Sequence, residues 1–131
     1  MTEVPLMYKH GETNISIEGI VIRNKPRFIS NREGIRRNWA KVLKAASGMD
    51  RWILWADAES SFAMTPESLD LIISRMKSLK KYGCIGVAFT LSNPIIPYYA
   101  NKIKSVMDIP FLASKSVIEI KDFIESLSAE N

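Results

Sequence analysis

The chain has 131 residues, of which 47% are hydrophobic and 24% are charged, and this length and composition indicate one globular domain and argue against intrinsic disorder. It has no apolar run of about 18 residues and no secretory signal, which favours a cytoplasmic protein without a transmembrane segment. A single cysteine, Cys84, excludes an internal disulfide and a multi-thiolate metal site, and a single histidine, His10, argues against a metalloenzyme.

The formal net charge is +4, and the basic residues are grouped along the chain. Five lie in one segment and three end another: Arg32, Arg36, Arg37, Lys41 and Lys44, then Lys77, Lys80 and Lys81. This distribution is typical of solvated helix faces and of lysines at helix C-termini, so we expect no specific nucleic-acid binding. Electrostatic binding of a phosphate-rich partner, or peripheral contact with a membrane surface, is the alternative.

The first third of the chain predicts extended structure followed by one helix. Residues 14–22 alternate polar and apolar side chains before becoming apolar, which indicates a strand at a sheet edge. A second extended piece over residues 26–30 is expected to pair with it. A helix over residues 34–47, which Gly48 ends, is predicted by apolar residues at spacings of four, four and three: Ile35, Trp39, Leu43 and Ala46.

The next segment predicts a buried strand and a well-defined helix. Residues 51–57, RWILWAD, form a short apolar run between charges, as a buried strand does. Thr65 is a favourable N-cap and Pro66 fits the first helical position. Apolar residues at helical spacing follow as far as residue 79, and Gly83 is expected to terminate the helix.

The last third repeats this alternation twice. Residues 85–91 and 109–113 predict two further buried strands. Asn93 with Pro94 predicts the start of a helix over residues 94–107, and Ser116 has the capping-box spacing to Glu119 that opens a final helix.

Alternating strands and helices of these lengths predict an α/β fold with a mixed, mainly parallel sheet of four to five strands flanked by about four helices. No linker, repeat or low-complexity tract divides the chain. We therefore expect a single domain over residues 1–131, with loosely ordered ends at residues 1–13 and 128–131.

Polar residues follow the predicted parallel strands, at the edge where open α/β sheets bind ligands. The candidates for binding a ligand or partner are Asp57, Ser60, Ser61, Thr65, Thr90, Ser92 and Asn93. Helix N-termini at the same edge could hold an anion. The alternative is that these residues only cap helices and form turns.

The predicted helix over residues 94–107 has apolar side chains on more than one face. A stripe too wide for one sheet favours a second contact with a partner subunit, a hydrophobic ligand or a membrane surface. A helix fully buried in its own domain is the alternative. The candidate contact residues are Ile95, Ile96, Tyr98, Tyr99 and Ile103.

No set of residues predicts catalysis. Ser60 and Ser61 lack a nucleophile-elbow setting and a nearby histidine. Asp57 and Glu59, two residues apart in extended chain, need not converge as an acid and base. Cys84 is interpreted as a small buried apolar residue. We therefore predict a protein that is not an enzyme, with no metal or cofactor.

Two stretches carry a family resemblance: WILWAD with TPESLDLIISRMKSLKKYGCIGVAFTL, and IPFLASKSVIEIKDFIESL. Over residues 15–127 the chain resembles the SpoIIAA-like family within the STAS and Sec14 (CRAL-TRIO-like) group. The resemblance implies the mixed sheet already predicted, frequent homodimers and, from Sec14-like relatives, apolar chains held between sheet and helices.

The resemblance also implies a regulatory site that this chain alters. In phosphoregulated members a serine at the start of the helix after the central strand accepts phosphate. Here that helix start reads Thr65-Pro66-Glu67-Ser68, and Pro66 stands where the hydroxyl is needed. The resemblance thus predicts an interaction regulator similar to anti-sigma-factor antagonists but without the usual phosphoserine.

The hypothesis from the sequence is a small homodimeric binding module without enzyme activity. It binds a lipid-like hydrophobic ligand or a protein partner through the region of helix 94–107. One alternative is a STAS-type regulator that docks a partner on residues 57–65. The other is an enzyme that acts on a small anionic substrate at the carboxyl ends of the strands.

Overall fold

The computed structural model describes residues 12–130. Its main sheet has five strands in the order β1-β2-β4-β6-β7. Strands β1 (Glu12–Glu18) and β2 (Val21–Arg27) form an antiparallel hairpin, and β2, β4 (Trp52–Ala56), β6 (Cys84–Thr90) and β7 (Phe111–Ser114) run parallel. This arrangement confirms the predicted mixed, mainly parallel α/β sheet.

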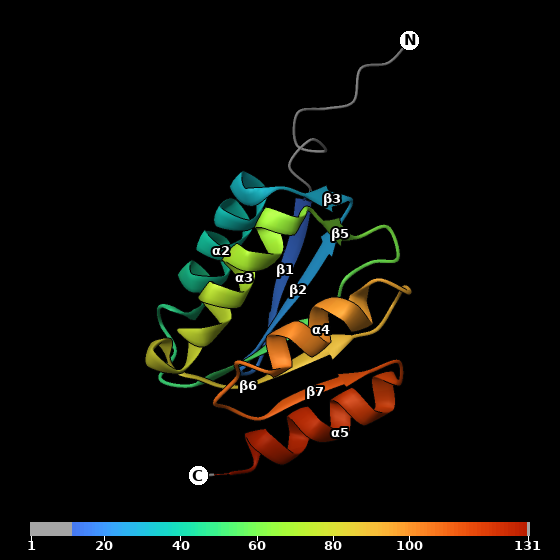
Figure 1. Ribbon diagram of the computed structural model, residues 1–131. Coiled ribbons are helices and arrows are strands. Elements are labelled where there is room, and N and C mark those ends of the chain that lie inside the picture. Colours follow the sequence, from blue (N-terminus) through green and yellow to red (C-terminus); the bar gives the residue numbers. More distant parts are fainter. Residues whose placement is uncertain (1–11, 131) are drawn as a thin grey trace.

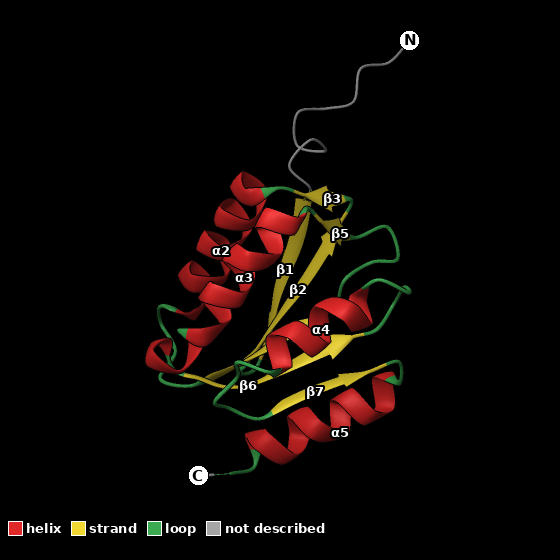
Figure 2. Cartoon of the chain, in the orientation of Figure 1, coloured by secondary structure: helices red, strands yellow, loops and turns green. Residues whose placement is uncertain are grey.

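Helices cover both faces of this sheet unequally (Figures 1 and 2). α2 (Arg32–Ala46), α3 (Pro66–Lys77) and α4 (Ile96–Lys104) pack on one face, and α5 (Val117–Ser128) packs on the other, beside β6 and β7. A short 3₁₀ helix, η1 (Leu79–Tyr82), follows α3. The unequal covering produces a large hydrophobic core on the three-helix face and a small one under α5.

The burial of strand β4 explains why its sequence is continuously apolar. All five of its residues are buried, because helices cover both faces of the sheet at this strand. Trp52 and Trp55 point to opposite faces, and each indole N–H is satisfied: Trp52 Nε1 donates to the Tyr82 carbonyl at 2.8 Å and Trp55 Nε1 to Thr90 Oγ1 at 2.9 Å.

The N-terminal strand differs from the prediction. Residues 14–22 are not one strand, because the chain reverses at Gly19, whose φ of +61° suits a residue without a side chain. The piece expected over residues 26–30 is also divided: Ile29–Ser30 forms β3, which pairs with β5 (Ala63–Met64) in a separate two-stranded sheet. Both strands have only two residues, and sequence patterns do not mark elements this short.

The helix boundaries depart from the predictions at both ends of α4 and at the C-terminal end of α3. α4 begins at Ile96 and ends at Lys104, so it is shorter than the predicted helix over residues 94–107. α3 ends at Lys77, and Gly83, with φ of +93°, ends the 3₁₀ helix that follows it.

The sequence predicted loosely ordered ends at residues 1–13 and 128–131, and most of these residues lie outside the described range. At the N-terminal side, Glu12 and Thr13 already belong to β1 and Thr13 is buried. At the other end, Ser128 is the last residue of α5. Ordered structure therefore extends slightly further at both ends than expected.

Candidate functional site

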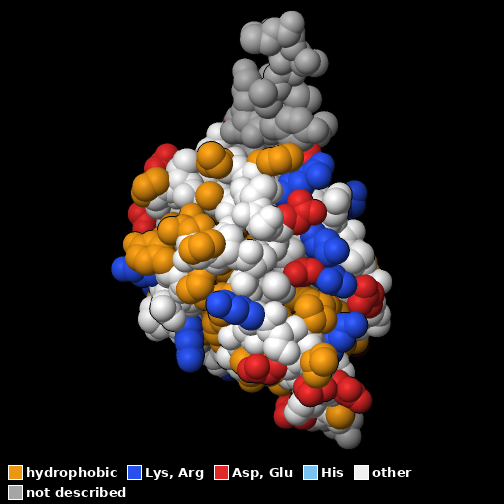
Figure 3. Space-filling view, turned by 90° about the vertical axis from the view of Figure 1, so that its right-hand side faces the viewer, with side chains coloured by type: hydrophobic (Ala, Val, Ile, Leu, Met, Phe, Trp, Pro, Cys, Tyr) orange, Lys and Arg blue, Asp and Glu red, His pale blue; other side chains and the backbone are white. Residues whose placement is uncertain are grey.

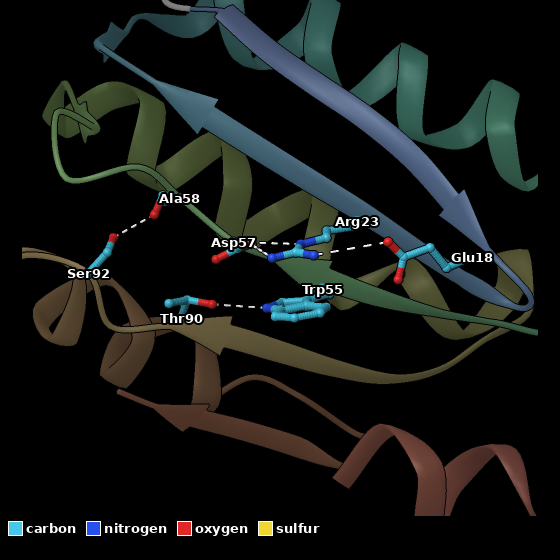
Figure 4. Close-up of polar contacts among 7 residues, drawn as sticks. All are labelled: Glu18, Arg23, Trp55, Asp57, Ala58, Thr90 and Ser92. Atoms are coloured by element: carbon cyan, nitrogen blue, oxygen red, sulfur yellow. Dashed lines mark hydrogen bonds and ion pairs between the residues drawn. The ribbon is translucent and has the colours of Figure 1, made fainter. Parts of the chain in front are cut away.

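The loops that follow β4 and β6 are joined by side chains that the sequence selected as binding candidates. The Ser92 hydroxyl donates to the Ala58 carbonyl at 2.5 Å, as Figure 4 shows. Asn93 Nδ2 donates to the carbonyls of Ser60 and Phe62 at 3.0 and 2.9 Å. These bonds position the loop before β5 against the start of α4.

Asn93 has a second role at the start of α4. Its Oδ1 accepts from the backbone N–H groups of Ile95 and Ile96 at 2.9 and 3.0 Å. All the hydrogen-bonding groups of this amide side chain thus serve the local backbone. Asn93 thus accepts backbone N–H groups at the start of α4, but the N-cap position of this helix is Ile95, two residues later than expected.

Asp57 belongs to a charged cluster on the sheet face that α5 covers only in part (Figure 4). Its Oδ2 accepts from Arg23 Nε and Nη2 at 2.8 and 2.6 Å. The guanidinium lies over the Trp55 ring, 4.0 Å from its centroid, and also approaches Glu18. Thr90 accepts the Trp55 indole N–H from the next strand. Asp57 and Thr90 therefore hold β2, β4 and β6 together on this face.

The remaining hydroxyls at this edge also bond within the protein. Ser61 Oγ accepts from the Phe28 backbone N–H at 3.2 Å. Thr65 occupies the N-cap position of α3, but its hydroxyl pairs with Ser68 Oγ at 2.6 Å instead of capping a backbone N–H. Ser68 is completely buried, so this hydroxyl is not exposed to a kinase.

This edge of the molecule faces the viewer in Figure 3. Lys, Arg, Asp and Glu side chains intermingle over one half of the view, and hydrophobic side chains gather towards the opposite margin. The mixed signs of charge give no single-sign field to attract an anion. The polar candidates at the strand ends therefore form a structural network, and the apolar candidates on α4 are the more informative group.

The two faces of α4 have different environments. Ile96, Tyr99 and Ile103 are buried against the sheet, whereas Ile95 and Tyr98 are 42% and 52% exposed. The apolar surface predicted on more than one face of this helix is thus present, and its two parts border different spaces.

The inner face of α4 borders a cavity of about 60 Å³ between the sheet and helices α2, α3 and α4. Its walls are apolar and aromatic for the most part, and include Trp39, Leu54, Phe62, Phe89, Tyr99 and Ile103. None of the described residues that line it is charged. A space of this size holds a few water molecules or a few heavy atoms of a ligand.

Three polar residues interrupt the apolar wall of this cavity: Asn24, Ser30 and Asn38. Asn24 Oδ1 accepts a hydrogen bond from the Thr13 hydroxyl. The Ser30 side chain is completely buried, and its hydroxyl has no hydrogen-bond partner within residues 12–130. Because an unpaired buried hydroxyl costs stability, Ser30 is the polar group in this layer that most needs an explanation.

Sequence analysis did not select these three polar residues. Asn38 carried a recognisable signal, because it lies three residues after Ile35 and four before Val42 on the buried stripe of α2. Asn24 lies on the same face of β2 as buried Ile22, again against the pattern. Ser30 carried none, since its strand has only two residues.

The outer face of α4 borders a groove between α3 and α4 with a volume of about 460 Å³. Ile95 and Tyr98 line it from α4, and Leu69 and Ile73 line it from α3. It also contains one charged residue of each sign, Asp70 and Lys102. This groove is open to solvent and more polar than the cavity.

Tyr99 and Met64 are the two residues that line both spaces. The Tyr99 hydroxyl accepts from the Met64 backbone N–H at 2.9 Å and lies 3.3 Å from the Met64 carbonyl, to which it donates. We call this contact between α4 and β5 the Tyr99 partition. It lies where the cavity and the groove adjoin.

Metal-binding groups and the single cysteine were the remaining candidates for chemistry. Residues 12–130 contain no group of three or more His, Cys, Asp or Glu side chains arranged to hold a metal ion. Cys84 is buried, and burial raises the pKa of its thiol to about 11, opposed in part by backbone hydrogen bonding at Gly86 and Leu54. A thiol with this pKa is protonated at neutral pH and is a poor nucleophile.

Across residues 12–130, no helix has the length and hydropathy that crossing a membrane requires. The basic side chains of α2 selected from the sequence, such as Arg36 and Lys41, are exposed. They form a solvated face, as the distribution of charge predicted.

No protein-family model and no curated protein matches the chain. Among solved structures, it is similar to an uncharacterized protein of the DUF3478 family with a SpoIIAA-like fold from Shewanella loihica PV-4. The two chains are 10% identical, the match covers 87% of this chain and 93% of that one, and the TM-score is 0.63. The Sec14-like part of the predicted resemblance stays a prediction. The strand order, the layers and this likeness together show that the chain has a SpoIIAA-like fold.

Proposed function

We propose that this protein is a binding module without enzyme activity, and that it holds a small, mainly apolar, uncharged ligand in the cavity beneath α4. The observation that carries the proposal is the fully buried Ser30 hydroxyl, which lacks a partner within the described chain and borders that cavity. A ligand with one hydrogen-bonding group satisfies this hydroxyl, and its apolar remainder matches the walls.

The charge of the cavity wall selects among ligands. A carboxylate or an ammonium group placed there would be removed from water without an opposite charge, which is costly. A neutral hydroxyl, carbonyl or amide avoids this penalty and bonds to Ser30 or Asn38. We therefore expect alcohols and amides to bind in preference to carboxylic acids of the same length.

The experiment compares 1-butanol with butanoate in two-dimensional amide NMR titrations, with fluorescence of the cavity-lining Trp39 as a second signal. We expect 1-butanol to shift amide signals around the cavity and to bind at least about tenfold more tightly than butanoate, since an unpaired buried charge costs more than 1.4 kcal/mol. Absence of any shift at cavity residues with 1-butanol contradicts the proposal.

A pair of matched substitutions separates cavity binding from surface binding. Ala58→Leu adds three carbon atoms to a residue that lines the cavity, so it should fill the space and remove 1-butanol binding. Ala40→Leu makes the same change on the exposed face of α2 and should leave binding unaltered. Equal binding by the two variants would place the alcohol elsewhere.

A second candidate function, regulation through a protein partner or a second copy, is favoured by Ile95 and Tyr98. These large side chains are exposed next to each other on α4 and line the groove. The homodimer and the docking of a regulatory partner stay predictions, and sedimentation analysis of the full chain tests the first.

A further inference from the structure

We propose that the Tyr99 partition opens as a door and that the complete ligand is an elongated apolar molecule. The uncharged polar end of this ligand passes Tyr99 and reaches Ser30. Its tail lies in the groove between α3 and α4. This inference rests on the proposed function, because it assumes that the cavity binds a ligand. It adds the route of entry, the length of the ligand and its orientation.

The first argument is that the cavity alone is small, although its apolar walls suit a ligand. With about 60 Å³, the cavity is well below the roughly 150 Å³ at which an apolar protein cavity binds benzene. The groove on the other side of Tyr99 has about 460 Å³. Displacement of one side chain joins the two spaces into a site that is long enough for a medium-length alkyl chain.

The second argument is the chemistry of the contact itself. The Tyr99 ring is 5% exposed, and its hydroxyl is held by the Met64 N–H and C=O groups. These bonds are made to the backbone of one residue, so a single side-chain rotation breaks them together. The wall on the other side is a methionine, whose flexible side chain adapts readily to a new neighbour.

The third argument is a continuous series of aromatic rings that leads from one space to the other. Phe62 lines the cavity, Tyr99 lines both spaces and Tyr98 lines the groove. Tyr99 makes edge contacts with both neighbours, at centroid separations of 6.4 Å to Phe62 and 6.1 Å to Tyr98. When Tyr99 moves, an alkyl chain that takes its place contacts aromatic surface along the whole path.

The fourth argument is the weak attachment of the wall that carries Met64. Strand β5 has two residues and pairs with β3, which also has two. A ladder this short contributes little stability by itself. Phe28, directly before β3, has a φ of +63°, which is unfavourable for a residue with a bulky side chain. Opening at this point therefore leaves the strand pairing of the main sheet unchanged and moves one residue of the large core, Tyr99.

The orientation of the ligand follows from where the polar groups lie. The inner end meets Ser30 and Asn38 and no charged residue. The outer end lies near Asp70 and Lys102, where water and charge are available. A primary alcohol with an unbranched chain of about eight carbons has the required chemistry, and 1-octanol is the probe of choice.

The test uses the full chain as wild type, Tyr99→Phe and the matched control Tyr82→Phe, which changes an exposed tyrosine that lines neither the cavity nor the groove. Stopped-flow measurement of Trp fluorescence gives the association rate of 1-octanol. We expect Tyr99→Phe to raise this rate on the order of tenfold, because the variant keeps the ring but loses the bonds that hold it closed. Tyr82→Phe should leave the rate within about twofold of the wild type, because it keeps these bonds.

Two further measurements make the outcomes distinct. Hydrogen exchange at the Met64 amide should accelerate in Tyr99→Phe but not in Tyr82→Phe. In wild type, nuclear Overhauser contacts from bound 1-octanol should reach both Ile72 in the cavity and Ile73 in the groove. The wild-type contacts decide the question even if Tyr99→Phe does not fold.

Equal association rates for wild type and Tyr99→Phe would contradict the proposal that Tyr99 opens to admit the ligand. Nuclear Overhauser contacts confined to the groove would also contradict it. The proposed function would survive either result if 1-butanol still shifted the signals of cavity residues. If neither alcohol perturbs cavity residues in any of the three proteins, both the proposed function and the proposed opening at Tyr99 are wrong.

Discussion

Ser30 in β3 and Ser68 in the first turn of α3 are both completely buried, but only one of the two hydroxyls has a hydrogen-bond partner within residues 12–130. Ser68 Oγ pairs with Thr65 Oγ1 at 2.6 Å, whereas Ser30 Oγ has no partner within residues 12–130. The same side chain therefore stabilises the protein at one position and costs stability at the other. A buried residue that lowers stability and makes no compensating contact within the protein is a candidate for function.

This contrast predicts opposite effects of the same substitution. Ser30→Ala should raise the free energy of unfolding by about 1 kcal/mol, because it removes an unpaired buried hydroxyl. Ser68→Ala should lower it by about 1 kcal/mol, because it removes a satisfied one. Urea denaturation without ligand measures both. A loss of stability in Ser30→Ala equal to that in Ser68→Ala would show that the Ser30 hydroxyl is not unpaired in solution.

Cys84 links the buried state of one residue to the pH dependence of stability. Burial is the main cause of the increase in the pKa of its thiol from 9.0 to about 11. Between these values the folded thiol keeps its proton while the unfolded thiol loses it. The folded state then binds more protons than the unfolded state, so stability decreases as pH rises through this window.

We expect the contribution of Cys84 to be present below pH 9 and to fall by about 2–3 kcal/mol up to pH 11. Urea denaturation of wild type and Cys84→Ala at pH 8, 9, 10 and 11 isolates it, because the two proteins differ only at this residue. The stability difference between them should shrink as pH rises. A constant difference would mean that the thiol ionises equally in both states.

At the scale of elements, the junction between η1 and β6 depends on Gly83. Its φ is +93°, and a Cβ at this position would lie 2.8 Å from the Asp50 carbonyl oxygen. Two independent constraints, backbone conformation and close approach, thus require glycine here. The approach positions β6 beside β4, because the Gly83 carbonyl accepts the Trp52 N–H at 3.1 Å.

Gly83→Ala should therefore lower the free energy of unfolding by at least about 2 kcal/mol, from the unfavourable φ and the clash with rigid backbone. Gly48→Ala is the matched control, since a Cβ there has no atom within 4 Å and its φ is not positive. It should be neutral or stabilising by up to about 1 kcal/mol. Thermal denaturation compares the two, and similar melting temperatures would contradict the assignment.

The sequence predicted the long helices and strands more accurately than the short ones. α3 and α5 have long apolar stripes and recognisable start signals, and their boundaries are close to those predicted. The turn at Gly19 was missed because the alternation continues through it with only one glycine as a break. β3 and β5 were missed because two residues have no period, yet they carry Ser30 and Met64.

At the scale of the whole molecule, the three-helix face and the single-helix face are packed differently. α5 packs closely on its face: a Cβ at Gly86 would lie 2.3 Å from Leu127 Cδ1. On the other face, the large core between the sheet and α2, α3 and α4 contains the cavity. The asymmetry leaves close packing on one side and space for a ligand on the other.

By itself, the sequence determined the α/β class, the mainly parallel sheet, the buried central strands and the two-sided character of α4, because these depend on local hydrophobic periodicity. Only the tertiary structure decided which side chains meet across elements. It placed Ser30 and Asn38 in one cavity and Tyr99 against Met64, and it engaged the polar residues at the strand ends with one another. The reason is that these contacts join residues up to 35 positions apart, and no local pattern encodes such distances.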